Sequence, residues 1–513
     1  MARYKDYNYE QGKLIPISFR EQILPGTFEH TLSYLIDHEL DLSVFDQRYH
    51  NDATGAPAYD PALLLKIVLY AYSRGITSSR RIERCCRENI IFMALSADTQ
   101  PHFTSIAGFI SQMEGEIVAL FRNVRLICDA QGLIGREMFA IDGCKLPSNA
   151  SKEWSGTKAE LNAKRIKLER AIRRMLKTHR ERDVREVNGE LEAREQQYIA
   201  TLKHQVKKLR AWLGDHDDKP GKTGKPRKSN VTDNDSAKMR TSHGVIQGYD
   251  GVAAVDDRHQ VVVHAEAFGE AQEHDLLQPM LEATQEHFAA LGEEAVYRRA
   301  RITADSGFHT ERNAEYLYTN HIEGYLADNR MRSRDPRFQD VDKYKARSRA
   351  EKRQWQGRPD RFTNQDFRYD PDRHTCLCPA GKSLYSNGSN LTINGYAAVK
   401  FTAPKSACRP CHLRSRCLKF PDRTEVRQVA FFTGEYRKPE TFTQMMKRKI
   451  DSLAGKAIYH RRIATVEPVF GHLRNLGLDR FTLRGKPKVD AQWKLYCIVH
   501  NLLKIHRYGV GFG

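Results

Sequence analysis

Residues 459–484 read YHRRIATVEPVFGHLRNLGLDRFTLR, a basic stretch with Glu467 in its most apolar part. We predict a helix with Thr465 as its N-cap, which places Glu467 and Pro468 in the first turn, where the missing N–H of proline costs nothing. Helical spacing places Arg474 on the side of Glu467, beside an apolar stripe that packs on a core. A solvated surface glutamate is the alternative interpretation, since most glutamates are exposed. Phe470 shares the side of Glu467, and the stripe consists of Val466, Val469 and Leu473.

Two aspartates upstream each follow a short apolar run. Residues 138–141 (MFAI) precede Asp142, which we predict to close a buried strand, and residues 302–304 (ITA) precede Asp305 in the same way. A carboxylate at the exposed end of an apolar strand is where α/β folds place chemistry. Asp142, Asp305 and Glu467 are therefore the candidate acidic site. Each aspartate taken alone could instead be a turn or cap residue.

Composition limits the classes of partner and the cellular compartment. The 513 residues, enough for roughly two to four domains, include 83 Lys plus Arg against 64 Asp plus Glu, a formal net charge of +19. This charge favours a polyanionic partner, and nucleic acid is the simplest one. The chain has no run of about twenty apolar residues, and its start, MARYKDYNYEQGK, lacks a signal-peptide core. We therefore expect a cytoplasmic protein, nucleoid-associated when bound to DNA, with no membrane partner.

Residues 1–130 are predicted to form a helical N-terminal domain. One helix begins at Asp60-Pro61 and ends at Gly75, and two further helices follow it. Short helices with arginines between them are typical of a helix-turn-helix module, so we predict that this domain binds DNA. A helical packing domain is the alternative.

Residues 157–230 are predicted to be an insertion. Residues 157–213 are dense in charge and carry apolar residues at helical spacing, which predicts two long helices that turn near Asn188-Gly189. A linker rich in Gly, Pro and Lys follows. The charges of this helical hairpin most simply form a solvated face, and contact with DNA is the alternative.

The other core segments are residues 131–156, 231–328 and 449–513. The first carries the Asp142 strand, and the last carries C-terminal helices with Glu467. The middle segment is predicted to contain a β-hairpin, an amphipathic helix over residues 273–292, the Asp305 strand, a helix from Glu311 and a further strand. The expected fold class is therefore α/β, with three antiparallel strands followed by alternating helices and parallel strands.

Residues 329–448 form a predicted basic insertion, small, β-rich and cysteine-containing. Four of the ten cysteines lie from Cys376 to Cys411, and Cys417 follows. In a reducing compartment this clustering predicts a metal site rather than disulfides, and a CxxC pair with two further thiols fits a tetrahedral structural zinc site. Reduced cysteines in a β domain are the alternative. The predicted zinc ligands are Cys378, Cys408, Cys411 and Cys417, with Cys376, His374 and His412 as substitutes.

The predicted strand order resembles a ribonuclease-H-like fold. Together with IDGCKLPSNAS (141–151), TADSGFHTERN (303–313) and RRIATVEPVFGHLRNLGLDRFTLRG (461–485), it makes the chain similar to the DDE transposases of bacterial insertion sequences. The similar group has a helical N-terminal domain and a long insertion between the second aspartate and the glutamate. The resemblance covers nearly the whole chain, including LLLKIVLYAYSRGITSSRRIERCCREN (63–89) and TDNDSAKM (232–239).

The resemblance implies that Asp142, Asp305 and Glu467 are the catalytic acids and hold two Mg²⁺ or Mn²⁺ ions. Two hard divalent cations stabilise the attacking and leaving oxygens of a phosphodiester, so no side-chain nucleophile is needed. Arg474 stands where the family usually has Lys, and it is a candidate to hold a DNA phosphate. Further candidates for contact with a DNA phosphate are Arg462, Lys145 and His309. Because Tyr459 and Arg462 lie one residue further from Glu467 than in the family pattern, we rank both below Arg474.

The expected function is a DNA transposase that binds the terminal inverted repeats of its element, cleaves DNA and transfers strands. The expected partner is double-stranded DNA, at the element ends and the target, bound by a homodimer, with no small-molecule substrate. Trp355 and nearby arginines are expected to contact DNA, as insertions at this place do in related enzymes. A Mg²⁺-dependent nuclease of the same fold without strand transfer, and a catalytically inactive DNA-binding derivative, are the alternatives.

Overall fold

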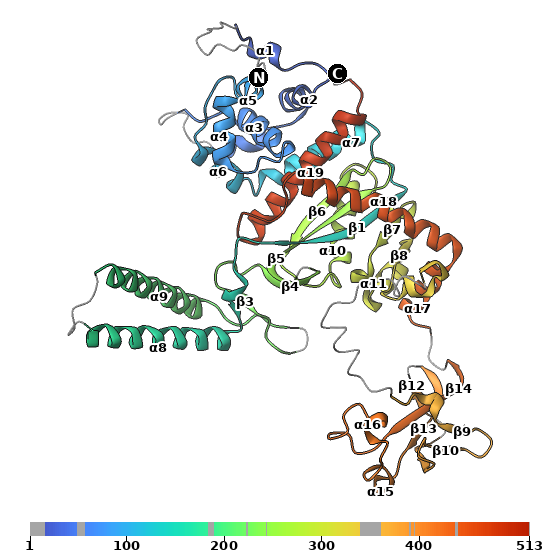
Figure 1. The fold of residues 1–513 in the computed structure, drawn as a ribbon. Helices are drawn as coiled ribbons and strands as arrows, with labels where there is room; N and C mark the ends of the chain where they lie inside the picture. The colour runs from blue at the N-terminus through green and yellow to red at the C-terminus, as the bar shows by residue number, and fades with distance from the viewer. Residues whose placement is uncertain are drawn as a thin grey trace, which may run out of the picture. The chain divides into compact units, whose positions relative to one another are not determined.

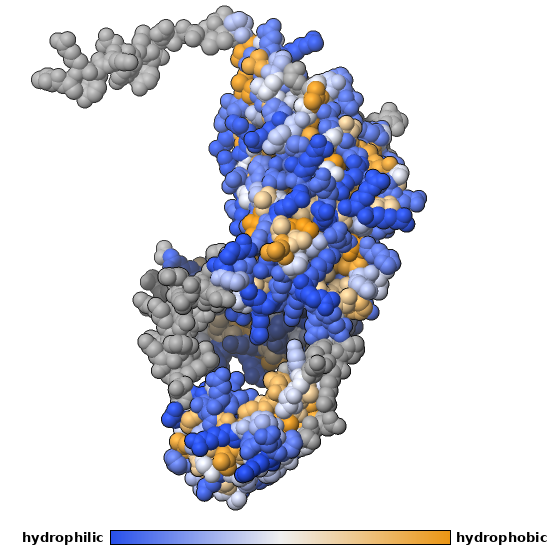
Figure 2. Space-filling view, turned by 90° about the vertical axis from the view of Figure 1, so that its right-hand side faces the viewer, coloured by the Kyte–Doolittle hydropathy of each residue, from blue (hydrophilic) through white to orange (hydrophobic). Residues whose placement is uncertain are grey.

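The computed structural model divides into two compact units, Met1–Asn329 with Met446–Gly513 and Arg330–Met445, which we describe separately (Figure 1). It describes residues 16–48, 57–182, 189–221, 224–242, 244–338, 361–388, 391–393, 395–436 and 440–511. None of the helices within these ranges is long and apolar enough to cross a membrane. The face in Figure 2 is largely hydrophilic, with apolar residues in small separate groups, as expected for a chain with 29% charged residues.

A six-stranded mixed sheet forms the centre of the first unit. Its order is β4-β5-β1-β7-β8, and β6 also pairs with β5. The pairs β4-β5, β5-β6 and β1-β5 are antiparallel, whereas β1-β7 and β7-β8 are parallel. The predicted mixed α/β class is confirmed, and the sheet contains one strand that was not predicted, β4. The strands are β1 (Met138–Pro147), β4 (Ala237–Thr241), β5 (Gly244–Asp256), β6 (Val262–Phe268), β7 (Arg301–Ala304) and β8 (Gly324–Leu326), and β2 (Ser155–Gly156) pairs separately with β3 (Ser229–Asn230).

Strand β1 does not end at Asp142, so that part of the prediction was wrong. It continues to Pro147 because β5 pairs with it from Phe139 to Pro147. Asp142 instead lies level with the end of the parallel neighbour β7, since Ile141 is paired with Ala304 and no pair follows. Pairing with the antiparallel strand β5 thus extends β1 beyond the end of its parallel neighbour β7.

Helices cover both faces and one edge of the sheet. On one face Phe139 packs against Phe288 of α10, with ring centroids 5.6 Å apart; on the other, α18 crosses β1, β5, β7 and β8. The edge strand β6 is covered by α19, whose Asn501 bonds both the N–H and the C=O of Val262. This satisfies backbone groups that an open edge would leave unpaired. The helices are α10 (Leu277–Ala289), α11 (Glu311–Thr319), α17 (Phe442–Asp451), α18 (Leu453–Asn475) and α19 (Lys486–Tyr508).

Helix α18 begins twelve residues before the predicted cap. Ser452 is its N-cap and Thr465 lies inside it, where its hydroxyl donates to the carbonyl of Arg461 at 2.9 Å. Pro468 is therefore an interior proline, which cannot donate to the carbonyl of Ala464. Gln260 Nε2 donates to that carbonyl at 2.9 Å instead. The predicted apolar stripe is confirmed, since Val466, Val469 and Leu473 are buried.

The N-terminal segment is helical, as predicted. The Asp60 carboxylate accepts from the N–H of Ala62 at 2.7 Å and caps α3, and Gly75 follows this helix with φ +70°. Tyr72 of α3 packs on Tyr496 of α19 with ring centroids 4.9 Å apart, which joins these helices to the core. The helices are α1 (Phe19–Gln22), α2 (Phe28–Tyr34), α3 (Pro61–Ser73), α4 (Ser79–Glu88), α5 (Ile90–Leu95), α6 (Phe103–Gln112) and α7 (Glu116–Ala130).

Two long helices, α8 (Lys158–Arg182) and α9 (Gly189–Asp215), follow β2 and precede β3 in the chain, and they lie side by side (Figure 1). Buried apolar residues form the seam between them, among them Leu161, Leu209 and Trp212 near the sheet end. The predicted turn at Asn188 lies outside the described residues. The seam explains the helical apolar spacing, because each helix covers the apolar side of the other.

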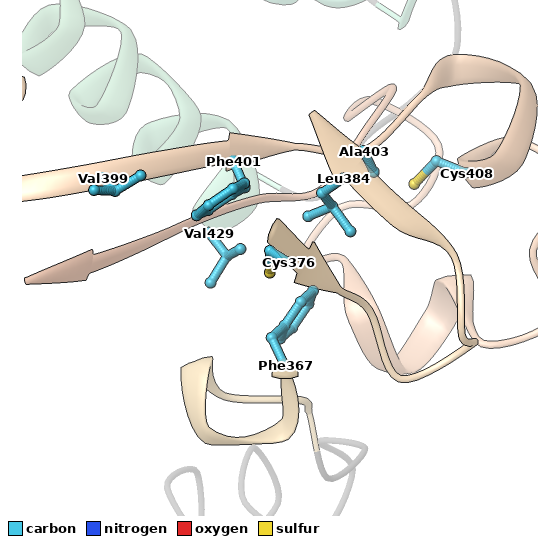
Figure 3. Packing of buried hydrophobic residues seen from close by; sticks show 8 residues of the cluster. All are labelled: Phe367, Cys376, Leu384, Val399, Phe401, Ala403, Cys408 and Val429. Carbon is cyan, nitrogen blue, oxygen red and sulfur yellow. The ribbon is translucent and has the colours of Figure 1, made fainter. Parts of the chain in front are cut away.

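The second unit contains a six-stranded sheet around a small core (Figure 3). Phe367, Phe401 and Val429 pack there with the buried Cys376. Trp355 lies outside the described residues. The strands are β9 (Arg368–Asp370), β10 (Thr375–Leu377), β11 (Ser383–Ser386), β12 (Leu391–Ile393), β13 (Tyr396–Thr402) and β14 (Gln428–Tyr436), and the short helices are α12 (Met331–Arg334), α15 (Lys405–Cys408) and α16 (Arg414–Cys417).

Candidate active site

Asp142 and Asp305 lie next to each other on neighbouring parallel strands. Asp305 directly follows Ala304, the last paired residue of β7, and Asp142 directly follows its partner Ile141. The Asp305 carboxylate accepts from the N–H of Gly307 at 2.8 Å, and the Asp142 carboxylate accepts from the N–H of Gly143 at 2.9 Å. The structure thus brings together two of the three predicted acids.

Arg462 reaches Asp142 from helix α18. Its Nη2 lies 2.5 Å from Asp142 Oδ2, and the Arg462 side chain is only 7% exposed. The family spacing had ranked Arg462 below Arg474, yet Arg462 is the cation in contact with a predicted catalytic acid. A buried ion pair of this kind fixes the position of α18 over β1, because either charge left alone would be strongly destabilising.

The carboxyl groups of the pair are unusually hard to ionise. Burial raises the pKa of Asp142 to about 7; Arg462 opposes this rise, while the charge of Asp305 adds to it. Burial also raises the pKa of Asp305, with the charge of Glu273 as the next cause. Like charges in a desolvated place resist ionisation unless a cation joins them. The site is therefore short of positive charge.

Three further charged residues, Lys145, Asp250 and Glu273, adjoin the aspartates. Lys145 Nζ pairs with Glu273 Oε1 at 2.7 Å, and Lys145 is the cross-strand neighbour of Asp250. Burial lowers the pKa of Lys145, but its hydrogen bond to Glu273 and the surrounding acids raise it overall. Asp250 is fully buried, and although neither of its oxygens accepts a hydrogen bond from a described N–H or O–H group, its carboxyl group is close enough to that of Glu273 to share a hydrogen bond. Burial raises its pKa well above the ordinary value, with the charge of Glu273 as the second cause.

A cleft of about 480 Å³ continues from the acids along β1. It runs from Gly143 to Pro147 and is flanked by Glu273 and Arg474. Arg474 Nη2 lies 3.7 Å from the sulfur of Cys144, so the predicted phosphate-binding arginine borders this cleft. Burial raises the pKa of the Cys144 thiol, and Arg474 opposes the rise.

Glu467 lies on the exposed side of α18. It is five residues from Arg462, so at 3.6 residues per turn the two side chains point about 140° apart. Arg462 rather than Glu467 thus occupies the side of the helix that contacts Asp142. Glu467 is two turns from Arg474, on the same flank of α18, as the spacing predicted. Tyr459 is half-buried, and His309 Nδ1 lies 2.9 Å from the carbonyl oxygen of Leu326.

The carboxylates suit a divalent metal ion. Asp142, Asp250, Glu273 and Asp305 carry four negative charges when ionised, against two positive charges on Lys145 and Arg462, which leaves a deficit of two. Carboxylate oxygens are the donors that Mg²⁺ and Mn²⁺ prefer. Among the described residues, no three such side chains are already arranged around a common metal position. The donor chemistry therefore fits the ion, and Arg462 holds Asp142 in place.

The predicted zinc ligands lie near one another in the second unit. Burial raises the pKa of the Cys417 thiol, and Cys408, Cys378 and Cys411 are close enough to raise it further. Cys376 differs, because its thiol is fully buried in the apolar core beside Phe367 (Figure 3). Among the described residues of this unit too, no three His, Cys, Asp or Glu side chains are already arranged around a common metal position. All of these cysteines are free thiols.

Sequence reasoning missed Glu273 and Asp250. The predicted helix began at Glu273, but α10 begins at Leu277, so Glu273 lies in the loop before it. Asp250 lies inside GVIQGYDGVAAV, where an acid in an otherwise apolar strand was a signal that went unused. A buried carboxylate in a strand requires a partner.

Two family models match the chain. One, described as Transposase DDE domain, matches residues 377–506, and the other, described as Transposase domain (DUF772), matches residues 17–112. The first match includes Glu467, Arg474 and the four predicted zinc ligands, and it begins after Asp305. A DDE domain implies a ribonuclease-H-like core, in agreement with the mixed α/β sheet. No match was found among curated proteins.

Proposed function

We propose that this chain, whose two transposase-domain matches are consistent with a DDE transposase of an insertion sequence, binds the inverted repeats at the ends of that element, cleaves there and joins the 3′ ends to target DNA. The observation that carries the proposal is the pairing of Asp142 and Asp305 at the end of β7. Two buried acids with raised pKa values, next to a cleft that Lys145 and Arg474 help to line, suit phosphodiester chemistry.

Asp142, Asp305 and Glu467 would hold Mg²⁺ or Mn²⁺. When bound, such ions supply charge stabilisation at the attacking and leaving oxygens of the phosphodiester. The protein's own residues position these acids: Gly143 and Gly307 fix one oxygen of each aspartate through backbone N–H groups, and Arg462 fixes the second oxygen of Asp142. For Glu467 the support is its place on α18, whose buried face rests on β1.

DNA is the proposed partner, at the element ends and at the target. Arg474 borders the cleft and is the candidate contact for a phosphate next to the scissile bond, because a guanidinium matches phosphate geometry. The formal charge of +19 favours long-range attraction to DNA. Joining two ends in one reaction requires both to be held together, so we propose a homodimer on DNA acting in the cytoplasm.

A structural zinc ion is a separate part of the proposal. Cys378, Cys408, Cys411 and Cys417 would be its ligands, and Cys408 and Cys411 have the spacing of a zinc knuckle. The support is the closeness of the other three thiols to Cys417 and the turn at Cys378, whose carbonyl accepts from the N–H of Gly381 at 2.8 Å. Such an ion would stabilise a small unit with a limited core.

The test is cleavage of a labelled duplex that carries the element's own ends, with Mg²⁺ or with EDTA. Wild-type protein should cut in Mg²⁺ alone, and Asp142→Asn, Asp305→Asn and Glu467→Gln should retain binding but lose cutting. Unchanged cutting by Glu467→Gln would remove this residue from the mechanism. Joined products separate a transposase from a nuclease of the same fold, and binding without any cutting by wild type would indicate an inactive DNA-binding derivative.

A further inference from the structure

We infer that Glu273 is an additional carboxylate ligand of the active-site cations, next to Asp305, and that Lys145 is its counter-ion while no metal is bound. This inference rests on the proposed function for the identity of the site. It concerns a loop residue that lies outside the three predicted acids. Four observations carry it.

The position of Gly307 places Glu273 beside Asp305. A Cβ at Gly307 would overlap Glu273 Oε2 and lie 3.0 Å from Asp305 Oδ1. The two carboxylate oxygens therefore flank the same backbone position. Glycine at 307 leaves the room that lets the Glu273 carboxylate approach the turn that holds Asp305.

Glu273 is largely buried, yet it reaches the cleft that runs along β1. Its side chain is only 10% exposed, and it is one of the residues that line this cleft. A buried carboxylate at the border of a cleft is placed to bind a cation that enters it.

Lys145 occupies only one of the two Glu273 oxygens. Its Nζ binds Glu273 Oε1 at 2.7 Å, which leaves Oε2 directed toward Gly307 and Asp305. Arg462 is committed to Asp142. A divalent ion would therefore meet Glu273 Oε2 and the Asp305 carboxylate on the two sides of Gly307.

Asp250 is a second buried carboxyl group beside Glu273. It is fully buried, and its Oδ1 lies 2.7 Å from where a Cβ on Gly143 would be, so it points at the strand position next to Asp142. Neither oxygen accepts a hydrogen bond from a described N–H or O–H group, and its hydrogen-bond partner is the carboxyl group of Glu273. Two buried carboxyl groups in contact require a proton or a cation between them.

The experiment measures Mn²⁺ binding to the full-length protein without DNA, by electron paramagnetic resonance and calorimetry. Glu273→Gln should weaken Mn²⁺ binding by at least about tenfold. Lys145→Gln should bind Mn²⁺ as well as wild type or better, because it frees Glu273. The matched control is Glu270→Gln, three residues away on a side chain that is 43% exposed, which should bind like wild type. Thermal unfolding without metal shows whether each variant is folded.

The outcomes separate this inference from the proposed function. Equal Mn²⁺ affinity in folded Glu273→Gln and wild type overturns the inference, whatever the DNA assay gives. Weakening by Lys145→Gln to the same degree as Glu273→Gln also overturns it, because the pair would then be merely structural. Mn²⁺ binding that depends on Glu273, in a protein that cuts no DNA, would support the ligand and refute the proposed transposase activity.

Discussion

Arg462 and Asp142 form an ion pair 2.5 Å long between helix α18 and the central strand β1, with both side chains largely buried. The two residues are 320 positions apart in the chain. The pair therefore links the C-terminal helix to the first strand of the core, and it holds one predicted catalytic acid in place.

Replacing Arg462 by Met should reduce DNA cleavage by at least about 100-fold, since misplacing a reacting group by an ångström costs that much. It should also lower the free energy of unfolding by about 1–3 kcal/mol, because the buried Asp142 carboxyl group would lose the donor to its second oxygen. Chemical denaturation and the cleavage assay measure the two effects. The control is Arg227→Met: Arg227 and its partner Glu270 are 44% and 43% exposed, so the loss of this pair should cost at most about 1 kcal/mol. Equal losses in the two variants would contradict the buried-pair argument.

The sequence predicted the acid pair well because strand signals are local. Apolar runs before Asp142 and Asp305, combined with the parallel connection, were enough to bring the two residues together. It misjudged Arg462 because counting from a family spacing cannot show which side of a helix faces a strand. The extent of α18 was missed because Pro468 was read as a first-turn residue, whereas Gln260, about 200 positions earlier, satisfies the carbonyl that the proline leaves open.

Glu273 was hidden for a different reason. Loop residues carry no periodic pattern, and the acid at the start of EHDLLQPM reads equally well as a favourable first-turn charge. Only the closeness of its carboxylate to Gly307 and Lys145 distinguishes it from a helix-terminal acid. Contacts between loops and strand ends come from the tertiary fold, so no local signal reports them.

Gly307→Ala should weaken Mn²⁺ binding without removing any carboxylate. The added Cβ would overlap Glu273 Oε2, and because a glutamate side chain is flexible, the carboxylate should move aside at little cost in stability. Calorimetry should show a loss in affinity in the same direction as Glu273→Gln. The control is Gly108→Ala in α6, where a Cβ meets nothing within 4 Å and metal binding should not change. Affinity that is unaffected by Gly307→Ala would mean that Glu273 can bind metal from another position.

The protein should lose stability as the pH falls below about 6.5, partly through His500. Burial lowers the pKa of His500 to about 3, and its ring nitrogens contact His472 Nδ1 and the carbonyl of Gln260 at 2.8 Å each. An unfolded histidine takes up a proton near pH 6.5, so the unfolded state binds more protons between pH 6.5 and 3. By linkage, this histidine should lower the free energy of unfolding by about 2 kcal/mol at pH 5 relative to pH 8. Chemical denaturation across this pH range measures the effect. In His500→Gln the free energy of unfolding should depend less on pH than in wild type, and an equal pH dependence in both proteins would exclude this histidine as a cause.

Zinc content should distinguish Cys417 from Cys376. If the second unit binds zinc as proposed, purified protein should contain about one Zn per chain, and Cys417→Ser should lose it. Cys376→Ser should keep zinc but destabilise the unit by about 2 kcal/mol, because a hydroxyl would then be buried among Phe367 and its neighbours. Elemental analysis and thermal unfolding check the two parts. Wild-type protein that is folded and free of zinc would refute the metal site and leave the cysteines as core thiols.

Pro468→Ala should stabilise the protein by about 1–3 kcal/mol. Alanine restores the N–H that an interior turn of α18 lacks and removes the clash of the proline ring with the preceding turn. The new N–H would compete with Gln260 Nε2 for the carbonyl of Ala464. Gln260→Ala should therefore cost about 1 kcal/mol in the wild-type background and less in Pro468→Ala. A double-mutant cycle by chemical denaturation measures this coupling, and if Gln260→Ala costs the same in both backgrounds, the glutamine does not compensate for the proline.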